Sequence, residues 1–196
     1  MKSIATPDLL NGANPVDFEV IRSEIVYHGH VFDVRQDHLR LPNGNISPID
    51  VVDHRGAVTM IPVDGQGQIW FIRQYRHAIK KVLLELPAGA AEIGEPPLTS
   101  AQRELREEIG MAAGSLVEIG SFYLAPGYSS EFMHLFLATD LQAAPLPADE
   151  DEYLKIEKIS ARQALRLAET GELVDSKSLI ALFWSRPHLA RLGLLE

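Results

Sequence analysis

The sequence of 196 residues contains no cysteine. This absence excludes disulfide bonds, a thiolate nucleophile and zinc sites with cysteine ligands. The chain also has no apolar run near the roughly 20 residues that a membrane-spanning helix needs, and its N-terminal stretch lacks the apolar segment of a signal peptide. We therefore expect a cytoplasmic protein without a membrane partner.

Positive charge is scarce as well. The chain has 18 Lys and Arg residues against 27 Asp and Glu residues, a formal net charge of -9. This balance argues against a nucleic-acid backbone as partner. A phosphate-bearing substrate would need a bound metal ion to reverse the sign of the local charge. Hydrophobic residues are 46% and charged residues 23%, so the chain has the composition of an ordinary globular protein.

The first quarter of the chain has the pattern of a small antiparallel sheet. Apolar and β-branched residues recur among polar ones at 21–27, 31–41 and 46–52, and Asn-Gly within 42–45 favours a tight hairpin. Such a sheet is too small to bury its own apolar side chains. We expect an N-terminal β extension over residues 1–52 and a separate domain over residues 53–196.

The second part alternates strands and helices. Apolar patterns and turn residues predict strands at 57–63, 68–75, 81–86, 115–124, 132–138 and 153–159. They also predict one helix between the third and fourth of these strands and two helices after the last. We expect the final helix to end before Pro187. Strands, a helix, strands and two helices together predict an α/β/α sandwich around a mixed β-sheet.

The first of these helices is densely charged. Thr99 followed by Gln102 predicts a capping box, and Gly110 is suited to end the helix. Between these capping positions lie three carboxylates whose spacing places them on one helix face, those of Glu104, Glu107 and Glu108. Like charges at this spacing cost about 0.2–0.5 kcal/mol per pair, and a divalent cation would relieve that repulsion. All-oxygen ligands favour Mg²⁺ or Mn²⁺ over zinc; the alternative is a solvated acidic face.

The surroundings of this helix favour the metal site. Gly89 is followed after five residues by Glu95, and after seven more by Arg-Glu-Leu-x-Glu-Glu-x-Gly-Met, which ends at Met111. This spacing resembles the Nudix box of the Nudix hydrolases. The resemblance implies the α/β/α fold and a loop–helix–loop that binds magnesium. It also implies hydrolysis of a nucleoside diphosphate linked to another group.

The resemblance also implies a role for each residue of the segment. The metal ligands would be the carboxylates of Glu104, Glu107 and Glu108 and the backbone carbonyl of Ala88. Gly89 would let the backbone turn beside the metal, and Glu95 would support the loop. From its spacing alone, Arg103, four residues before Glu107, can orient that carboxylate; the alternative is a plain surface pair.

Arginines precede the box on the second strand of this domain. Arg-Gln-Tyr-Arg at 73–76, followed by Glu-Leu-Pro-Ala-Gly at 85–89, resembles the ADP-ribose pyrophosphatases. The resemblance implies that Arg76 contacts substrate phosphate and that Glu85 is a further carboxylate of the site. Arg73 is a second candidate for binding phosphate, since guanidinium groups bind phosphate through paired hydrogen bonds. Alternatively, both arginines face solvent at the strand end.

A carboxylate outside the helix is a candidate general base. Ala-Pro-Gly-Tyr-Ser-Ser-Glu at 125–131 also resembles the ADP-ribose pyrophosphatases, in which a Glu of this loop assists catalysis. The resemblance gives that role to Glu131. Glu108 is the competing candidate for the base, and an exposed loop residue without a role is the alternative for Glu131.

The activity implied by the resemblance is Mg²⁺-dependent hydrolysis of ADP-ribose to AMP and ribose 5-phosphate. The alternatives are a Nudix pyrophosphatase for another nucleotide sugar, such as GDP-mannose, and a non-catalytic Nudix module that senses a nucleotide. ADP-ribose pyrophosphatases are homodimers that exchange their N-terminal sheets. The resemblance therefore also implies a homodimer, with residues 1–52 packed on the partner.

Overall fold

The computed structural model describes residues 18–92, 94–147 and 153–195, and the chain divides into two compact units, Met1–Asp53 and His54–Glu196. The described part of the first unit is an antiparallel sheet in the order β1-β2-β3. Its strands are β1 (Glu19–His28), β2 (Asp33–Arg40) and β3 (Ile46–Asp53). The turn between β2 and β3 has Gly44 at a φ of 84°, a conformation that glycine adopts without strain. The predicted hairpin is therefore confirmed.

The second unit contains two sheets. A four-stranded mixed sheet has the order β7-β4-β9-β8, in which only β4 and β9 are parallel, and an antiparallel sheet has the order β10-β5-β6. The strands are β4 (Ala57–Pro62), β5 (Gln68–Arg76), β6 (Lys81–Glu85), β7 (Ala88–Ala90), β8 (Met111–Tyr123), β9 (Phe132–Ala143) and β10 (Lys155–Ser160). The helices are α1 (Pro97–Glu108), α2 (Ala161–Glu169) and α3 (Ser176–Arg191).

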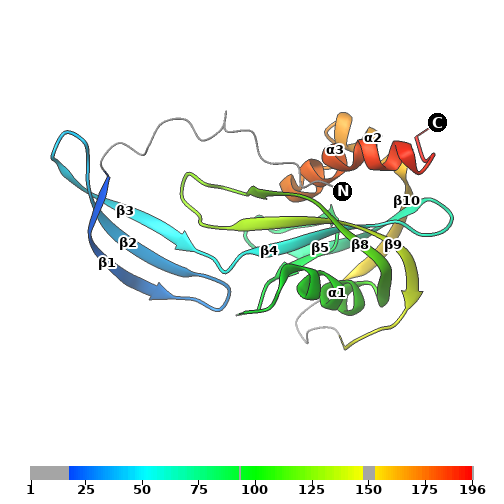
Figure 1. Cartoon of the computed structure of the whole chain (residues 1–196), viewed down its shortest axis with the longest axis horizontal. Coiled ribbons are helices and arrows are strands. Elements are labelled where there is room, and N and C mark those ends of the chain that lie inside the picture. The colour runs from blue at the N-terminus through cyan, green and yellow to red at the C-terminus, as the bar shows by residue number, and fades with distance from the viewer. Residues whose placement is uncertain (1–17, 93, 148–152, 196) are drawn as a thin grey trace. The chain divides into compact units, whose positions relative to one another are not determined.

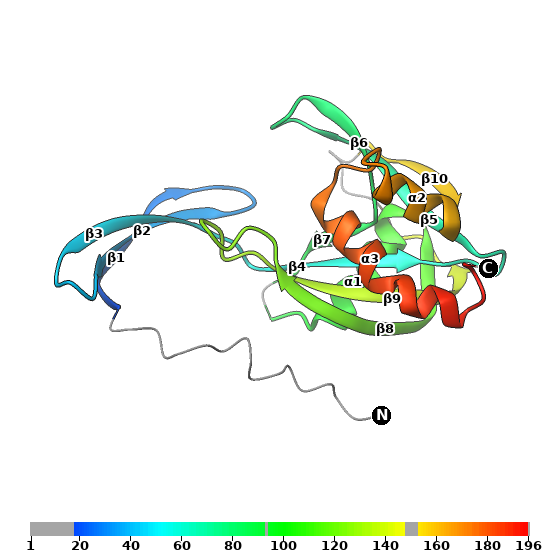
Figure 2. The same ribbon diagram turned by 90° about the horizontal axis from the view of Figure 1, so that it is seen from above.

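The strands lie between helices on both sides. Figure 1 shows α1 below the strands and α2 and α3 above them, and Figure 2, seen from above, shows α3 in front of the strands. Side chains alternate along β4 accordingly: Val58 and Met60 pack in the apolar cluster with α1, and Ile61 packs in the cluster with α2 and α3. The predicted α/β/α arrangement around a mixed sheet is confirmed. In the described ranges, none of the helices combines the length and apolar character needed to cross a membrane.

The start of α1 differs from the prediction. The helix begins at Pro97, its N-cap is Pro96, and no side chain caps it. Proline suits the first helical position because that position needs no amide donor, and the Pro96 carbonyl accepts from the amide of Thr99 at 2.9 Å. The capping box at Thr99 was therefore wrong. The side chain of Gln102 instead bonds to the backbone of Ala113.

The end of α3 also differs from the prediction. Pro187 lies inside the helix, which continues to Arg191. A proline within a helix removes one hydrogen bond at a cost of about 3 kcal/mol. Leu189, two residues later, is fully buried in the core that α2 and α3 cover. Its burial offsets part of that cost and keeps the last turn helical.

Candidate active site

Helix α1 carries carboxylates that are buried although they are charged. Its apolar residues Ala101 and Leu105 pack into the core, and this packing turns the neighbouring Glu104 and Glu108 inward. Glu104 is 9% exposed and Glu108 is 5% exposed. Carboxylates are rarely buried unless they are paired or bind metal. The alternative of a solvated acidic face is therefore wrong for these two residues.

Glu104 lies against the backbone of β7 at Gly89. A Cβ atom added to Gly89 would lie 2.0 Å from the Cδ of Glu104, a separation at which the side chain would have to move. Gly89 is held in place because β7 pairs with β4, with Val58 as its partner. Only glycine leaves room here for the carboxylate.

Arg103 connects the helix to the preceding loop. Its Nη1 donates to Glu104 at 2.7 Å and to Glu107 at 2.8 Å, and its Nη2 donates to Glu95 at 3.0 Å. The predicted contact between Arg103 and Glu107 is thus present. Hydrogen bonding to Glu95 raises the pKa of Arg103 and holds the pKa of Glu95 below its usual range, so this pair stays charged. Glu95 also accepts from Ser100 Oγ at 2.7 Å, which fastens the loop to the first turns of α1.

Glu108 bonds to a different part of the site. Its Oε2 accepts from the backbone amide of Ala88 at 2.9 Å. This bond fixes the backbone of Ala88, whose carbonyl is the predicted backbone ligand. Glu108 therefore lies next to the start of β7, whereas Glu104 and Glu107 share the guanidinium of Arg103.

The residue types fit a hard divalent cation, since every candidate ligand is a carboxylate or carbonyl oxygen. The space that Gly89 leaves for Glu104 also fits such a site. Among the described residues, however, no three His, Asp or Glu side chains form a group that could hold a metal as they stand. Arg103 lies between two of the carboxylates, and Glu108 bonds to the Ala88 amide instead. The roles of Ala88, Glu104, Glu107 and Glu108 as ligands stay predictions.

Glu131 lies at the same edge of the mixed sheet as the loop before α1. Ala57, at the start of β4, pairs with Ala90 on one side and with Met133 on the other. Glu131 comes two residues before Met133, and its backbone amide donates to Ser129 Oγ at 3.1 Å. The register thus places Glu131 at the edge where β7 ends. Its catalytic role stays a prediction.

Arg76 and Glu85 form a paired contact between β5 and β6. Nε of Arg76 donates to Oε1 of Glu85 at 2.8 Å, and Nη2 donates to Oε2 at 2.7 Å. Burial alone would raise the pKa of Glu85, but hydrogen bonds and charges from Arg76 and Lys177 outweigh it and hold this pKa below its usual range. The same contact with Glu85 raises the pKa of Arg76. Both groups are therefore charged.

Lys177 is the residue of this cluster that the sequence did not reveal. Its ammonium donates to Glu85 and also lies 3.0 Å from Asp175 Oδ2. Lys177 is 92 residues from Glu85, so no local pattern connects them. The one available signal was the capping aspartate at the start of α3, which places the following residues in a fixed first turn.

Arg73 is not part of this cluster. It donates to Glu157 on β10 at 2.6 Å. Arg73 and Arg76 are three residues apart on a strand that pairs without a break, so their side chains leave opposite faces of the sheet. The structure does not bring the two arginines together, and phosphate binding by Arg73 stays a prediction.

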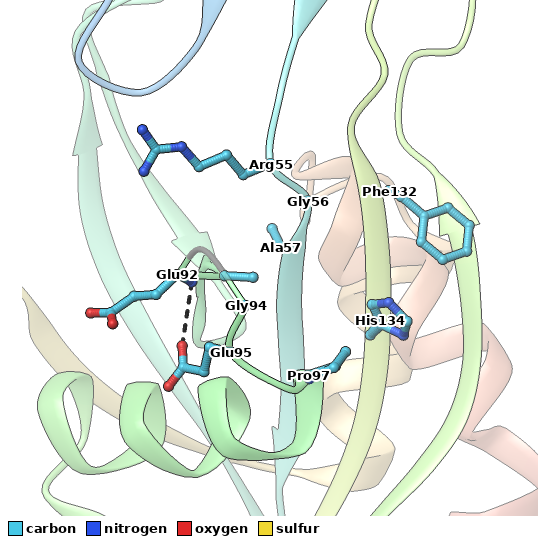
Figure 3. Close-up of a pocket in the computed structure, with 10 residues that line it drawn as sticks. Arg55, Gly56, Ala57, Glu92, Gly94, Glu95, Pro97, Phe132 and His134 are labelled. Atoms are coloured by element: carbon cyan, nitrogen blue, oxygen red, sulfur yellow. Dashed lines mark hydrogen bonds between the residues drawn. The ribbon is translucent and has the colours of Figure 1, made fainter.

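A cavity of about 390 Å³ lies beside the loop between β7 and α1. Figure 3 shows Glu92 and Glu95 on its loop side, and Phe132 and His134 on β9. The rings of Phe132 and His134 meet edge to face with centroids 5.1 Å apart. The cavity therefore offers aromatic surface next to the charged loop.

Comparison with known proteins agrees with this geometry. Residues 53–182 match the family model described as NUDIX domain. The ADP-ribose pyrophosphatase of Bacillus subtilis (strain 168) is 36% identical over 166 residues, which are 84% of this chain and 90% of that protein. The ADP-ribose pyrophosphatase of Mycobacterium tuberculosis (strain ATCC 25618 / H37Rv) is 39% identical over 163 residues, 82% of this chain and 79% of that protein. The crystal structure of an ADP compounds hydrolase superposes with a TM-score of 0.80 at 26% identity, over 92% of this chain and 99% of that one. The family predicted from the spacing between Gly89 and Met111 is confirmed: the chain belongs to the Nudix hydrolases.

Proposed function

We propose that this Nudix hydrolase cleaves the pyrophosphate bond of ADP-ribose and gives AMP and ribose 5-phosphate. The observation that carries the proposal is the position of the Glu104 carboxylate against Gly89, where an added Cβ would force that carboxylate to move. This contact holds a buried carboxylate beside the loop backbone. The names of the two bacterial relatives support ADP-ribose as the substrate.

We assign Mg²⁺, with Mn²⁺ as a substitute, to the carboxylates of Glu104, Glu107 and Glu108 and the carbonyl of Ala88. Bound there, the metal would neutralise phosphate charge and make the attacking water more acidic. Arg103 has to give up hydrogen bonds to Glu104 and Glu107 when these carboxylates take a metal. Its separate bonds to Glu95 would keep it next to the site, since they use other nitrogen atoms.

Arg76 is the proposed phosphate-binding residue. Its paired contact with Glu85 uses one edge of the guanidinium, and this side chain is 42% exposed. A guanidinium has five N–H donors, so donors remain for phosphate oxygens. Glu85 thus holds Arg76 in one orientation and leaves its outer edge for the substrate.

Glu131 is the proposed general base. Glu108 is buried, and one of its oxygens is already committed to the Ala88 amide, which suits a fixed ligand. Glu131 is only partly buried in the segment between β8 and β9. A carboxylate in a loop has the freedom to approach a water when substrate is bound. If Glu131 has no such role, Glu108 is the remaining candidate.

The two alternatives are another nucleotide sugar as substrate and a module that binds nucleotide without hydrolysis. The experiment is product analysis with Mg²⁺ over a panel of ADP-ribose, ADP-glucose, GDP-mannose and UDP-glucose. We expect AMP and ribose 5-phosphate from ADP-ribose at the highest kcat/KM. A higher kcat/KM for another nucleotide sugar would make that compound the substrate in place of ADP-ribose. Tight binding without products would make the protein a sensor.

We further propose a homodimer formed through the N-terminal sheet. Large apolar side chains of this unit face solvent in the single chain: Phe18, Val20, Ile21, Ile25, Val26, Tyr27, Val31, Phe32, Ile46 and Ile49. Exposed apolar surface on this scale is typical of an interface. A second copy related by a two-fold axis would cover it on both chains at once.

A further inference from the structure

We infer that Lys177 is a positioning residue for the reaction: through Glu85 it fixes the guanidinium of Arg76 that receives the substrate phosphate. The inference rests on the proposed function, because it deepens the role given there to Arg76. In the described structure, the contacts of Lys177 involve neither the loop before α1 nor the carboxylates of α1.

The buried carboxylate of Glu85 joins two cations that differ in exposure. The side chain of Glu85 is fully buried, that of Lys177 is 9% exposed, and that of Arg76 is 42% exposed. Glu85 therefore lies between a nearly buried cation and a partly exposed one. Because Lys177 and Arg76 both bond to Oε2 of Glu85, the ammonium fixes the plane of the carboxylate that accepts the guanidinium.

The charges of the cluster balance only when Lys177 is present. Two cations, Arg76 and Lys177, face two carboxylates, Glu85 and Asp175. Without the ammonium, Arg76 would be the one cation of the cluster beside two negative groups. An incoming phosphate would then meet a negative cluster, and Arg76 would be drawn inward toward the carboxylates.

The cluster is anchored to α3 through Asp175 and Lys177. Asp175 caps this helix by accepting from the amide and hydroxyl of Ser178, at 3.0 and 2.6 Å. Ser178 Oγ in turn accepts from the amide of Leu86 at 2.7 Å. Two adjacent residues of the β6 end, Glu85 and Leu86, are thus bonded to the first turn of α3. This attachment gives Lys177 a rigid base from which to hold Glu85.

The first test is steady-state kinetics of Lys177→Met with ADP-ribose and Mg²⁺. We expect KM to rise about tenfold while kcat changes by less than about threefold, since the lost interaction serves binding more than the chemical step. The matched control is Lys158→Met, which removes a lysine that lies 3.7 Å over the ring of Trp70 and outside the cluster. An unchanged KM in Lys177→Met, with an active wild type, would overturn the inference.

A double variant separates positioning from general damage. In an Arg76→Ala background, Lys177→Met should raise KM no further, because residues that act through one another are not additive. An equal rise in KM from Lys177→Met in the wild-type and the Arg76→Ala backgrounds would assign Lys177 a structural role only.

A measurement without substrate makes the inference independent of the substrate's identity. The ¹⁵N order parameter of the Arg76 Nε–H group should fall in Lys177→Met and stay unchanged in Lys158→Met. An unchanged order parameter in Lys177→Met would overturn the inference whatever the activity. If the order parameter falls but the wild type does not hydrolyse ADP-ribose, the proposed function fails and the control of Arg76 by Lys177 stands.

Discussion

The carboxylate of Glu104 occupies the space that a side chain at position 89 would need, since a Cβ on Gly89 would lie 2.0 Å from its Cδ. Gly89→Ala should therefore expel Glu104 and lower kcat/KM by about a hundredfold, the scale expected when a functional group is displaced by about 1 Å. Gly65→Ala is the control, because nothing lies within 4 Å of an added Cβ there. Equal activity of both variants would show that Glu104 is dispensable.

Activity should depend on metal through the carboxylates of α1. Chelation should abolish turnover, and Mg²⁺ or Mn²⁺ should restore it. Glu107→Gln and Glu108→Gln should each lower turnover by at least about a hundredfold through lost charge at the metal. Glu169→Gln, which removes only an exposed pair with Arg186, should leave turnover unchanged. Near-normal turnover in either of the first two variants would remove that residue from the metal site.

Glu131 should affect the chemical step more than binding. Glu131→Gln keeps the shape of the side chain and removes its basicity, so kcat should fall by about a hundredfold or more with little change in KM. Steady-state kinetics at saturating metal would measure this. Glu172→Gln, three residues beyond the end of α2, is the control. A wild-type kcat in Glu131→Gln would transfer the role of base to Glu108.

Stability at low pH should depend on Glu85. Its pKa in the folded protein lies below the ordinary value of 4.5, so the folded state binds fewer protons than the unfolded state. The stabilisation is therefore present above about pH 4.5 and is lost as the pH falls through the lower, folded-state pKa. Glu85→Gln should cost about 3–5 kcal/mol at pH 7, because it leaves the buried ammonium of Lys177 without this charged partner. Urea unfolding should show this difference shrinking in acid, and a difference independent of pH would contradict it.

The oligomeric state follows from the exposed apolar surface of the N-terminal sheet. Light scattering coupled to size exclusion should give twice the 21.7 kDa of one chain. Val20→Glu with Val26→Glu should shift the protein toward the monomer, since like charges at an apolar interface are not tolerated. A monomeric mass for the wild type at micromolar concentration would end the dimer proposal.

Local signals explain what the sequence could predict. The hairpin at Gly44 and the C-terminal end of α1 near Gly110 depend on neighbouring residues, and glycine has a positive φ at both. The Nudix loop was equally visible, because Gly89, Glu95 and the helix carboxylates lie within one short segment. Such features depend on short-range geometry that sequence spacing records.

Contacts between distant segments could not be read in this way. Lys177 meets Glu85 only because α3 packs against the strands, and Arg73 meets Glu157 only because β10 pairs with β5. The burial of Leu189 carries α3 through Pro187 against the local preference of proline. In each case tertiary packing decides what the local pattern leaves open.

The bond between Lys177 and Glu85 has a consequence for synthesis on the ribosome. Glu85 leaves the ribosome 92 residues before Lys177, so the nascent chain carries this carboxylate without the ammonium that balances it. The strands, the Nudix loop and α1 all emerge during that interval. If Lys177 controls Arg76 as proposed, Arg76 reaches its final orientation only after the first turn of α3 has been translated, which makes the proposed phosphate-binding arginine one of the last parts of the site to be completed.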